Sequence, residues 1–296
     1  MSEFFKRVFV AIIGIPLTIV FIFLGGIYFT TAIAIISTIA TLELFKMFEK
    51  KGLHPFKKIT IFANLLLTFT TYLYLNSLLL TGGNEILLFS LLMIIIFIFL
   101  LTALWTKKTN VLQNLMISLG VFFYISVTFI FLILLREFST LSLIINNKLT
   151  LNTSLITGKE PEFFLSLLIA IWLCDTAAYM IGSAIGKHKL FPKVSPKKTW
   201  EGAISGFFAA ILGFVLCTQI PILIKNFPIQ NAIVIGVIIG TIGQIGDLVE
   251  SKIKRDIGIK DSSDLLPGHG GVLDRFDSIM FVVPSIFIYL FIITNL

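Results

Sequence analysis

Residues 86–105 read ILLFSLLMIIIFIFLLTALW, twenty residues without a charge. A helix of this length rises about 30 Å, which matches the hydrocarbon core of a bilayer. The chain holds nine long apolar runs, five of which contain a single carboxylate, and they are too long and too continuous for the alternating strands of a membrane β-barrel. We therefore predict an all-α fold, a polytopic integral membrane helical bundle with about nine transmembrane helices. The runs lie at 8–24, 27–45, 59–80, 86–105, 111–135, 163–186, 200–220, 229–249 and 276–294.

The composition of the whole chain agrees with a membrane protein. Of its 296 residues, 57% are hydrophobic and 13% are charged, whereas a soluble domain carries about 25% charged residues. This composition excludes a soluble globular domain and a disordered chain. The two cysteines, Cys174 and Cys217, are too few for a disulfide scaffold or a zinc ribbon, and we expect both to be packing residues.

Basic residues sort to one side of the nine predicted spans. That side carries 19 of the 23 lysines and arginines, in the N-terminus, in 46–58, beside Lys107 and Lys108, in 187–198 and in 252–275. Because basic residues collect in cytoplasmic loops, we expect a cytoplasmic N-terminus and an external C-terminus. The first run is long for a signal peptide and lacks a clear cleavage site, so we expect it to be retained.

The chain changes character near its middle. We predict N-terminal transmembrane helices in 1–135, an external polar loop in 136–162 and a C-terminal catalytic transmembrane region in 163–296. Three spans of the last region each carry a Gly-x-x-x-Gly pair, which lets helix backbones approach closely. Repeated on three helices, the pattern indicates a compact C-terminal bundle. The pairs are Gly182 with Gly186, Gly202 with Gly206, and Gly236 with Gly240.

Four of the 16 acidic residues lie where a charge is hard to explain. Asp175 lies inside an apolar run, Asp247 ends the next run but one, and Asp274 and Asp277 open the last. The spacing of the last two predicts that they share one helical face. Adjacent carboxylates repel unless a cation lies between them, so we predict a metal site at Asp247, Asp274 and Asp277. The alternative is interface charges paired with basic neighbours, and the other twelve acidic residues are interpreted as loop or interface charges.

A glycine-rich loop lies between two of these carboxylates. Residues 267–271 read PGHGG and are expected to form a tight turn whose backbone N–H groups point at one anion, just before a helix. We interpret His269 as a hydrogen-bond donor to a substrate phosphate. The alternatives are that it acts as a general acid or base, or that it is only a residue of the turn. The neighbouring charged residues that we include in the substrate site are Lys252, Lys254, Arg255, Lys260 and Asp261.

A second basic loop spans 186–202. Its lysines serve in part as a cytoplasmic anchor, which is the alternative to a binding role. Four of its residues form a compact donor cluster before a helix, suited to a polyphosphate: Ser195, Lys197, Lys198 and Thr199.

These motifs together resemble a known family. Residues 251–277, the segment Asp175–Tyr179 (DTAAY), residues 195–202 (SPKKTWEG) and residues 246–251 (GDLVES) are similar to the signature blocks of phosphatidate cytidylyltransferases, also called CDP-diacylglycerol synthases. The resemblance covers about 162–280. It implies transfer of a cytidylyl group from CTP to phosphatidic acid with Mg²⁺ required, and it leaves room for a second, monovalent cation. It also implies a homodimer in the bacterial inner membrane.

The predicted roles follow from that reaction. Asp247, Asp274 and Asp277, with Lys254 and Arg255, are the predicted catalytic residues. The glycine-rich loop, including Gly270 and Gly271, and the lysines of the second loop are candidates for the CTP phosphates. Lys252, Lys254 and Arg255 are candidates for the lipid phosphate, and the two assignments could be exchanged. Asp175 is expected to support the residues that bind the metal without binding it itself.

Two other functions are alternatives to a cytidylyltransferase. An anion transporter also carries intramembrane carboxylates, but here they cluster at one face and the halves show no matching interrupted helices. A CDP-alcohol phosphotransferase would need an Asp-x-x-Asp-Gly cluster, which the sequence lacks. The predicted site opens to the cytoplasm, where nucleotides meet membrane lipids, and we expect no nucleic-acid partner.

Overall fold

The computed structural model describes residues 3–81, 86–139, 156 and 158–295. The chain forms two compact units, and each is described by itself. The first unit comprises Met1–Ile144 and Ile257–Arg275, and the second comprises Ile145–Asp256 and Phe276–Leu296.

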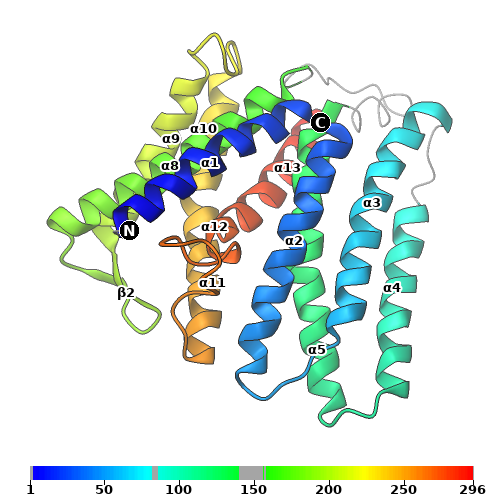
Figure 1. The fold of residues 1–296 in the computed structure, drawn as a ribbon. Helices are drawn as coiled ribbons and strands as arrows, with labels where there is room; N and C mark the ends of the chain where they lie inside the picture. Colours follow the sequence, from blue (N-terminus) through cyan, green and yellow to red (C-terminus); the bar gives the residue numbers. More distant parts are fainter. Residues whose placement is uncertain (1–2, 82–85, 140–155, 157, 296) are drawn as a thin grey trace. The chain divides into compact units, whose positions relative to one another are not determined.

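The first unit is a set of apolar helices that follow one another along the chain. Helices α2, α3 and α4 lie side by side (Figure 1). One long helix contains a π-helical segment, η1, between α5 and α6. The bounds are α1 Glu3–Leu24, α2 Gly26–Glu49, α3 Lys57–Thr81, α4 Ile86–Trp105, α5 Val111–Val121, η1 Phe122–Val127 and α6 Thr128–Arg136.

Both apolar and polar contacts hold the first unit together. Phe99 of α4 and Phe122 of η1 are fully buried, and their ring centroids lie 5.9 Å apart. Between α2 and α3, the Asn64 Nδ2 group donates to Ser37 Oγ at 2.9 Å and to Thr38 Oγ1 at 3.3 Å. Side-chain hydrogen bonds of this kind contribute to helix association in lipid, where water does not compete for them.

The second unit is a tighter bundle that also carries a small β-hairpin. Strands β1 and β2 pair antiparallel between α8 and α9, with Lys189 opposite Thr199 and Phe191 opposite Ser195. Another π-helical segment, η3, joins α10 to α11. The bounds are α8 Glu160–Ile185, β1 Lys189–Phe191, β2 Ser195–Thr199, α9 Trp200–Cys217, α10 Ile229–Ile238, η3 Ile239–Gly243, α11 Gln244–Ile257, α12 Leu273–Phe276, which reaches this unit only at its end, and α13 Ile279–Asn295.

The Gly-x-x-x-Gly pairs make the close helix contacts that the sequence predicts. A Cβ atom added at Gly202 of α9 would lie 2.6 Å from the Ala178 carbonyl oxygen of α8. One added at Gly236 of α10 would lie 2.5 Å from the Ile211 Cα atom of α9. At both contacts, α9 against α8 and α10 against α9, the backbones approach too closely for any residue with a Cβ atom. The prediction of a compact C-terminal bundle is confirmed.

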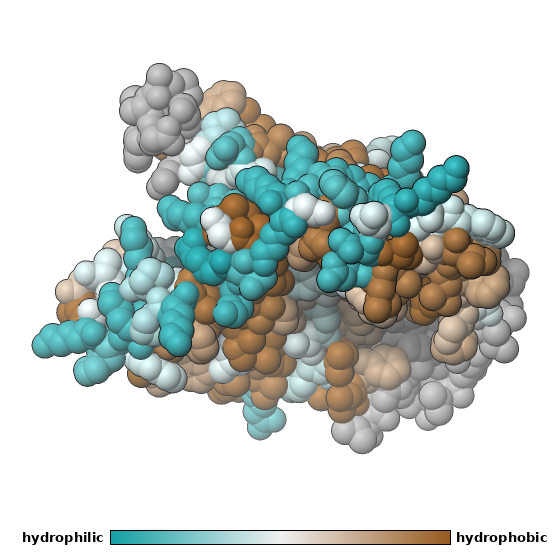
Figure 2. Space-filling model, turned by 90° about the horizontal axis from the view of Figure 1, so that it is seen from below, coloured by the Kyte–Doolittle hydropathy of each residue, from teal (hydrophilic) through white to brown (hydrophobic). Residues whose placement is uncertain are grey.

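The prediction of a multi-pass membrane protein is also confirmed. Within the described residues, seven helices are long and apolar enough to cross a bilayer, and Val8–Leu24 and Phe89–Trp105 are shorter apolar helices. Eight of the nine predicted runs fall, to within three residues at their ends, on a helix or on helical segments joined end to end, and the ninth, 276–294, is interrupted by a turn at 277–278. Most of the predicted external loop lies outside the described residues, and the three-part division of the chain stays a prediction. Figure 2 views the molecule from below, and hydrophilic side chains gather on part of this face, with hydrophobic side chains beside and behind them.

We predict that Gly202→Ala destabilises the protein, because the added methyl group would overlap the backbone of α8. Overpacking of this kind costs about 1–3 kcal/mol. Thermal unfolding in detergent measures the effect. Gly120→Ala on α5 is the control, since a Cβ there meets nothing within 4 Å. Equal unfolding temperatures for both variants would contradict the close contact.

Candidate functional site

The glycine-rich loop forms the predicted tight turn. We call residues 258–272, which connect α11 to α12, the 258–272 loop. Gly268 and Gly270 have φ angles of 76° and 79°, which side chains other than glycine rarely adopt. The His269 N–H donates to the Leu266 carbonyl oxygen at 2.8 Å, and the Leu266 N–H donates to the Gly270 carbonyl oxygen at 2.9 Å. The backbone of His269 is thus part of the turn.

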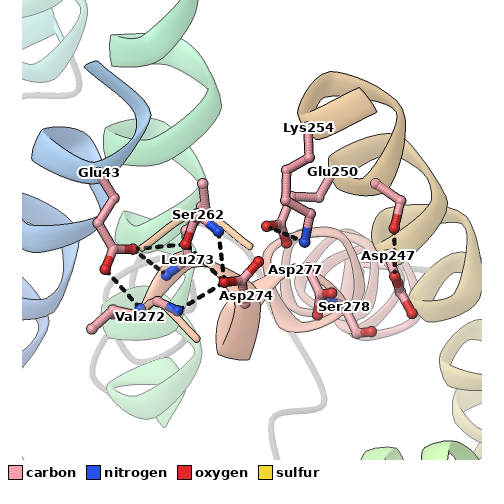
Figure 3. Close-up of polar contacts among 12 residues, drawn as sticks. Glu43, Asp247, Glu250, Lys254, Ser262, Val272, Leu273, Asp274, Asp277 and Ser278 are labelled. Atoms are coloured by element: carbon pink, nitrogen blue, oxygen red, sulfur yellow. Dashed lines mark hydrogen bonds and ion pairs between the residues drawn. The ribbon is translucent and has the colours of Figure 1, made fainter. Parts of the chain in front are cut away.

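Successive N–H groups at the end of this loop do point at anions, and the anions are carboxylates of the protein. The Gly271 N–H donates to Asp274 Oδ2 at 2.8 Å. The N–H groups of Val272 and Leu273 donate to the two oxygens of Glu43, at 3.0 and 2.8 Å (Figure 3). A substrate phosphate could therefore use the Gly271 N–H only by displacing Asp274. The roles of Gly270 and Gly271 in binding CTP stay predictions.

Asp274 organises the loop through one of its oxygens. Its Oδ2 atom accepts from the Ser262 N–H at 2.9 Å, from Ser262 Oγ at 2.9 Å and from Gly271. The Asp274 residue is only 9% exposed. Three donors on one oxygen satisfy a buried carboxylate and fix its orientation.

Glu43 is the residue that sequence reasoning missed. Its interpretation as a loop or interface charge is wrong, because Glu43 lies on α2, is 3% exposed and accepts hydrogen bonds from the 258–272 loop and from Leu273. A signal was present, since Glu43 is the only charged residue in the run 27–45. Like Asp175, Glu43 is a charged residue inside an apolar run, where a charge needs a partner.

In the second unit, the structure brings together two predicted site residues from different elements. Lys198 of β2 forms an ion pair with Asp247 of α11. The Ser251 hydroxyl, one turn further along α11, lies 3.3 Å from the other carboxylate oxygen of Asp247. The lysine and carboxylate side chains are 29% and 31% exposed, so this pair is accessible to water. The hairpin register places Lys198 beside the start of α9.

Asp277 lies close to this pair. Gly246 of α11 allows the approach, because a Cβ there would lie 2.7 Å from the Asp277 carbonyl oxygen. The Asp277 carboxylate is near enough to Asp247, and also to Asp175 of α8, for repulsion between them. Two carboxylates that repel Asp277, one of them paired with Lys198, form a setting that favours a bound cation.

The predicted common helical face of Asp274 and Asp277 is wrong. Helix α12 ends at Phe276, α13 begins at Ile279, and Asp277 lies in the turn between them. There its carboxylate accepts from the Ser278 N–H at 2.6 Å. The Asp277 carboxylate thus gives the Ser278 N–H a partner in place of the backbone carbonyl oxygen that it would have in a continuous helix.

The predicted metal set draws on both units. Asp274 belongs to the first unit, whereas Asp247 and Asp277 belong to the second. Among the described residues, no three His, Cys, Asp or Glu side chains are already arranged to hold a metal ion. The three-carboxylate metal site stays a prediction, and its support in the structure is the repulsion around Asp277.

The predicted basic residues of α11 fall into different environments. Lys254 is buried, and its Nζ atom lies 3.1 Å from Oε1 of the fully buried Glu250 (Figure 3). Lys252 is exposed. Arg255 is exposed and donates from Nε to the Val194 carbonyl oxygen at 3.1 Å, which ties α11 to the hairpin. Lys254 therefore has a structural role beside its predicted one.

The remaining predicted residues lie near these elements. Thr199 is buried and caps α9, since its Oγ1 atom accepts from the Gly202 N–H at 3.2 Å. Lys197, Asp175, Lys260 and Asp261 are exposed, and Ser195 and His269 are half-buried. Their contributions to substrate binding stay predictions.

We predict that Lys254→Gln destabilises the protein, because it removes the ammonium group beside the buried Glu250 carboxylate. Loss of one partner from a buried ion pair costs about 3–5 kcal/mol. Lys252→Gln, on the exposed side of the same helix, is the control and should change stability by less than about 0.5 kcal/mol. Thermal unfolding in detergent separates the two, and an unchanged Lys254→Gln protein would show that the pair does not stabilise α11.

Comparison with known proteins agrees with these motifs. The family model described as the cytidylyltransferase family matches residues 5–293. Phosphatidate cytidylyltransferases of Staphylococcus saprophyticus and Staphylococcus aureus are 44% and 45% identical over 129 residues, which is 44% of this chain and 49% of each relative. The matched segment thus spans about half the length of these curated relatives. Because the family model covers nearly the whole chain, the chain belongs to the cytidylyltransferase family.

Proposed function

We propose that the chain is a phosphatidate cytidylyltransferase, which transfers CMP from CTP to phosphatidic acid and releases CDP-diacylglycerol and pyrophosphate. The observation that carries the proposal is the ion pair between Lys198 and Asp247. It places a lysine suited to phosphate against a carboxylate suited to a metal ion, beside Asp277. Family membership and the names of the relatives support the same reaction.

The reaction needs charge compensation more than a strong base. A phosphate oxygen of phosphatidic acid attacks the α-phosphorus of CTP, and the bond from that phosphorus to the oxygen bridging to the β-phosphate breaks. Phosphatidic acid is already ionised near neutral pH, so the attacking oxygen carries its own charge. The obstacle is the approach of two anions, and positioned cations remove it.

The proposed cofactor is Mg²⁺, a hard cation that binds carboxylate oxygens. Asp247 and Asp277 would hold it from the second unit, and Asp274 is included for its place three residues before Asp277 in the chain. When bound, Mg²⁺ supplies the positive charge that neutralises the triphosphate and the departing pyrophosphate. A second, monovalent cation remains part of the proposal. Asp175 would support Asp277 from α8.

We propose one of the two phosphate assignments. Lys197 and Lys198 lie on an accessible hairpin, with Ser195 and Thr199 on the same strand, so we assign the hairpin to the CTP phosphates. The exposed Lys252 and Arg255 on α11 are assigned to the lipid phosphate. Lys254 contributes through its pair with Glu250. Supporting roles at the nucleotide are proposed for Lys260, Asp261, His269, Gly270 and Gly271.

The setting of the reaction is also a proposal. The sorting of basic residues supports a cytoplasmic N-terminus and a site that opens to the cytoplasmic face, where CTP is available. The matched relatives come from bacteria, which supports a location in the bacterial inner membrane, among the lipids that supply phosphatidic acid. We further propose a homodimer.

Purified protein with labelled CTP, phosphatidic acid and Mg²⁺ tests the proposal through the formation of CDP-diacylglycerol. We expect Lys198→Gln to lower kcat/KM for CTP about tenfold to a hundredfold, because a charge-assisted hydrogen bond to phosphate contributes about 1.5–3 kcal/mol. A smaller effect in the same direction is expected for Lys197→Gln. Efficiency is measured separately for CTP and for phosphatidic acid at fixed ionic strength.

Lys193→Gln is the matched control, since Lys193 is an exposed lysine of the same hairpin that lies outside the proposed donor cluster. It should leave the efficiency within about twofold, because other lysines keep the loop basic. Equal small effects of the three variants would show that the hairpin is only a membrane anchor. A wild-type protein that forms no CDP-diacylglycerol would contradict the proposed function itself.

A further inference from the structure

We infer that Glu43 is a positioning residue, which fixes the end of the 258–272 loop and through it Asp274. Four groups of this region converge on the Glu43 carboxylate. Oε1 accepts from the Val272 N–H at 3.0 Å and from Ser263 Oγ at 2.5 Å. Oε2 accepts from the Leu273 N–H at 2.8 Å and lies 3.2 Å from Ser262 Oγ.

This arrangement explains how a carboxylate is tolerated in an apolar helix. Glu43 is 3% exposed on α2, so water cannot stabilise its charge. A buried polar group needs hydrogen-bond partners in place of water, and backbone N–H and hydroxyl groups supply them to both oxygens of Glu43. The N–H groups of Val272 and Leu273 come before the hydrogen-bonded part of α12 and gain a partner from the same contact. Each side thus satisfies the other.

Ser262 links Glu43 to Asp274. Its Oγ atom lies 3.2 Å from Glu43 Oε2 and 2.9 Å from Asp274 Oδ2. A hydroxyl has one hydrogen, so it donates to one of these carboxylates at a time. The Ser262 N–H donates to Asp274 as well. A change at Glu43 is therefore transmitted to Asp274 through one side chain and through the backbone of residues 271–273.

The loop is shaped to admit this carboxylate. A Cβ atom at Gly271 would lie 2.6 Å from Glu43 Oε2, so the glycine leaves the space that Glu43 occupies. The inference deepens the proposed function and rests on it for one step, the service of Asp274 to Mg²⁺. The hydrogen bonds between Glu43 and the loop do not depend on that step.

Glu43→Gln tests the inference, because the amide keeps the size of the side chain but turns an N–H₂ group toward at least one donor. We expect the Val272 and Leu273 amides to exchange with deuterium at least about tenfold faster, while amides elsewhere on α2 do not change. We also expect Mn²⁺ binding, measured by electron paramagnetic resonance without substrates, to weaken about tenfold to a hundredfold. In turnover, the Mg²⁺ requirement should rise by a similar factor with little change in KM for CTP at saturating Mg²⁺.

Two further variants sharpen the test. Ser263→Ala removes one donor to Glu43 and leaves the charge, so smaller changes in the same direction are expected even if Glu43→Gln does not fold. Glu49→Gln is the control on the same helix, since that carboxylate is partly exposed and pairs with Lys57, away from the loop. It should leave amide exchange, Mn²⁺ binding and turnover unchanged.

The outcomes separate this inference from the proposed function. Unchanged amide exchange in Glu43→Gln and Ser263→Ala would overturn the inference, and so would faster exchange with unchanged Mn²⁺ binding, which would mark a purely structural contact. Faster exchange together with weaker Mn²⁺ binding supports it. That result would stand even if the wild-type protein formed no CDP-diacylglycerol, in which case only the proposed function fails.

Discussion

A charge inside a membrane helix needs partners, and this constraint decides where the polar residues of the chain lie. Water is absent from the hydrocarbon core, so each carboxylate there must meet donors or cations, or lose its charge. The buried Glu43 carboxylate meets two backbone N–H groups and two serines, and the buried Glu250 carboxylate meets Lys254, whereas Asp247, which is accessible to water, also pairs with Lys198. The carboxylates are thus arranged in pairs and clusters, and each cluster fixes the backbone around it.

The same constraint connects fold and chemistry. In the second unit, close glycine contacts hold α8, α9 and α10 together, and Gly246 brings α11 against the turn that carries Asp277. Asp277 is thereby held near Asp247 despite their repulsion. In the proposed metal site, a bound cation would relieve this repulsion. This is the property that a metal-dependent transfer between two anionic substrates requires.

The sequence predicts the membrane helices well because their signal is local. Each span is a long, mostly apolar run, and the Gly-x-x-x-Gly pairs indicate which helices pack closely. The sequence does not show where the breaks within helices fall. The turn at Asp277 interrupts a continuous helical pattern, and the hairpin at 189–199 lies in a segment that reads as a basic loop. Both depend on contacts with residues distant in the chain.

The site was predictable in its residue types and less so in its contacts. The clusters 195–199 and 267–277 stand out by composition, but the ion pair between Lys198 and Asp247 is not predicted by the sequence. The use of the loop N–H groups by Glu43 could not be read from spacing, because more than 200 residues separate Glu43 from Ser262 in the chain. A single carboxylate in the run 27–45 was the available signal. Treating every charge inside an apolar run as a functional candidate would have found it.

The proposed reaction depends most directly on the binding of Mg²⁺ by Asp277. The direct measurement is Mg²⁺-dependent turnover of CTP and phosphatidic acid by Asp277→Asn, compared with the wild type in the same detergent at matched thermal stability. The account predicts that chelation abolishes wild-type turnover and that the variant loses activity by orders of magnitude while remaining folded. A folded variant that keeps a large part of the wild-type activity would contradict it.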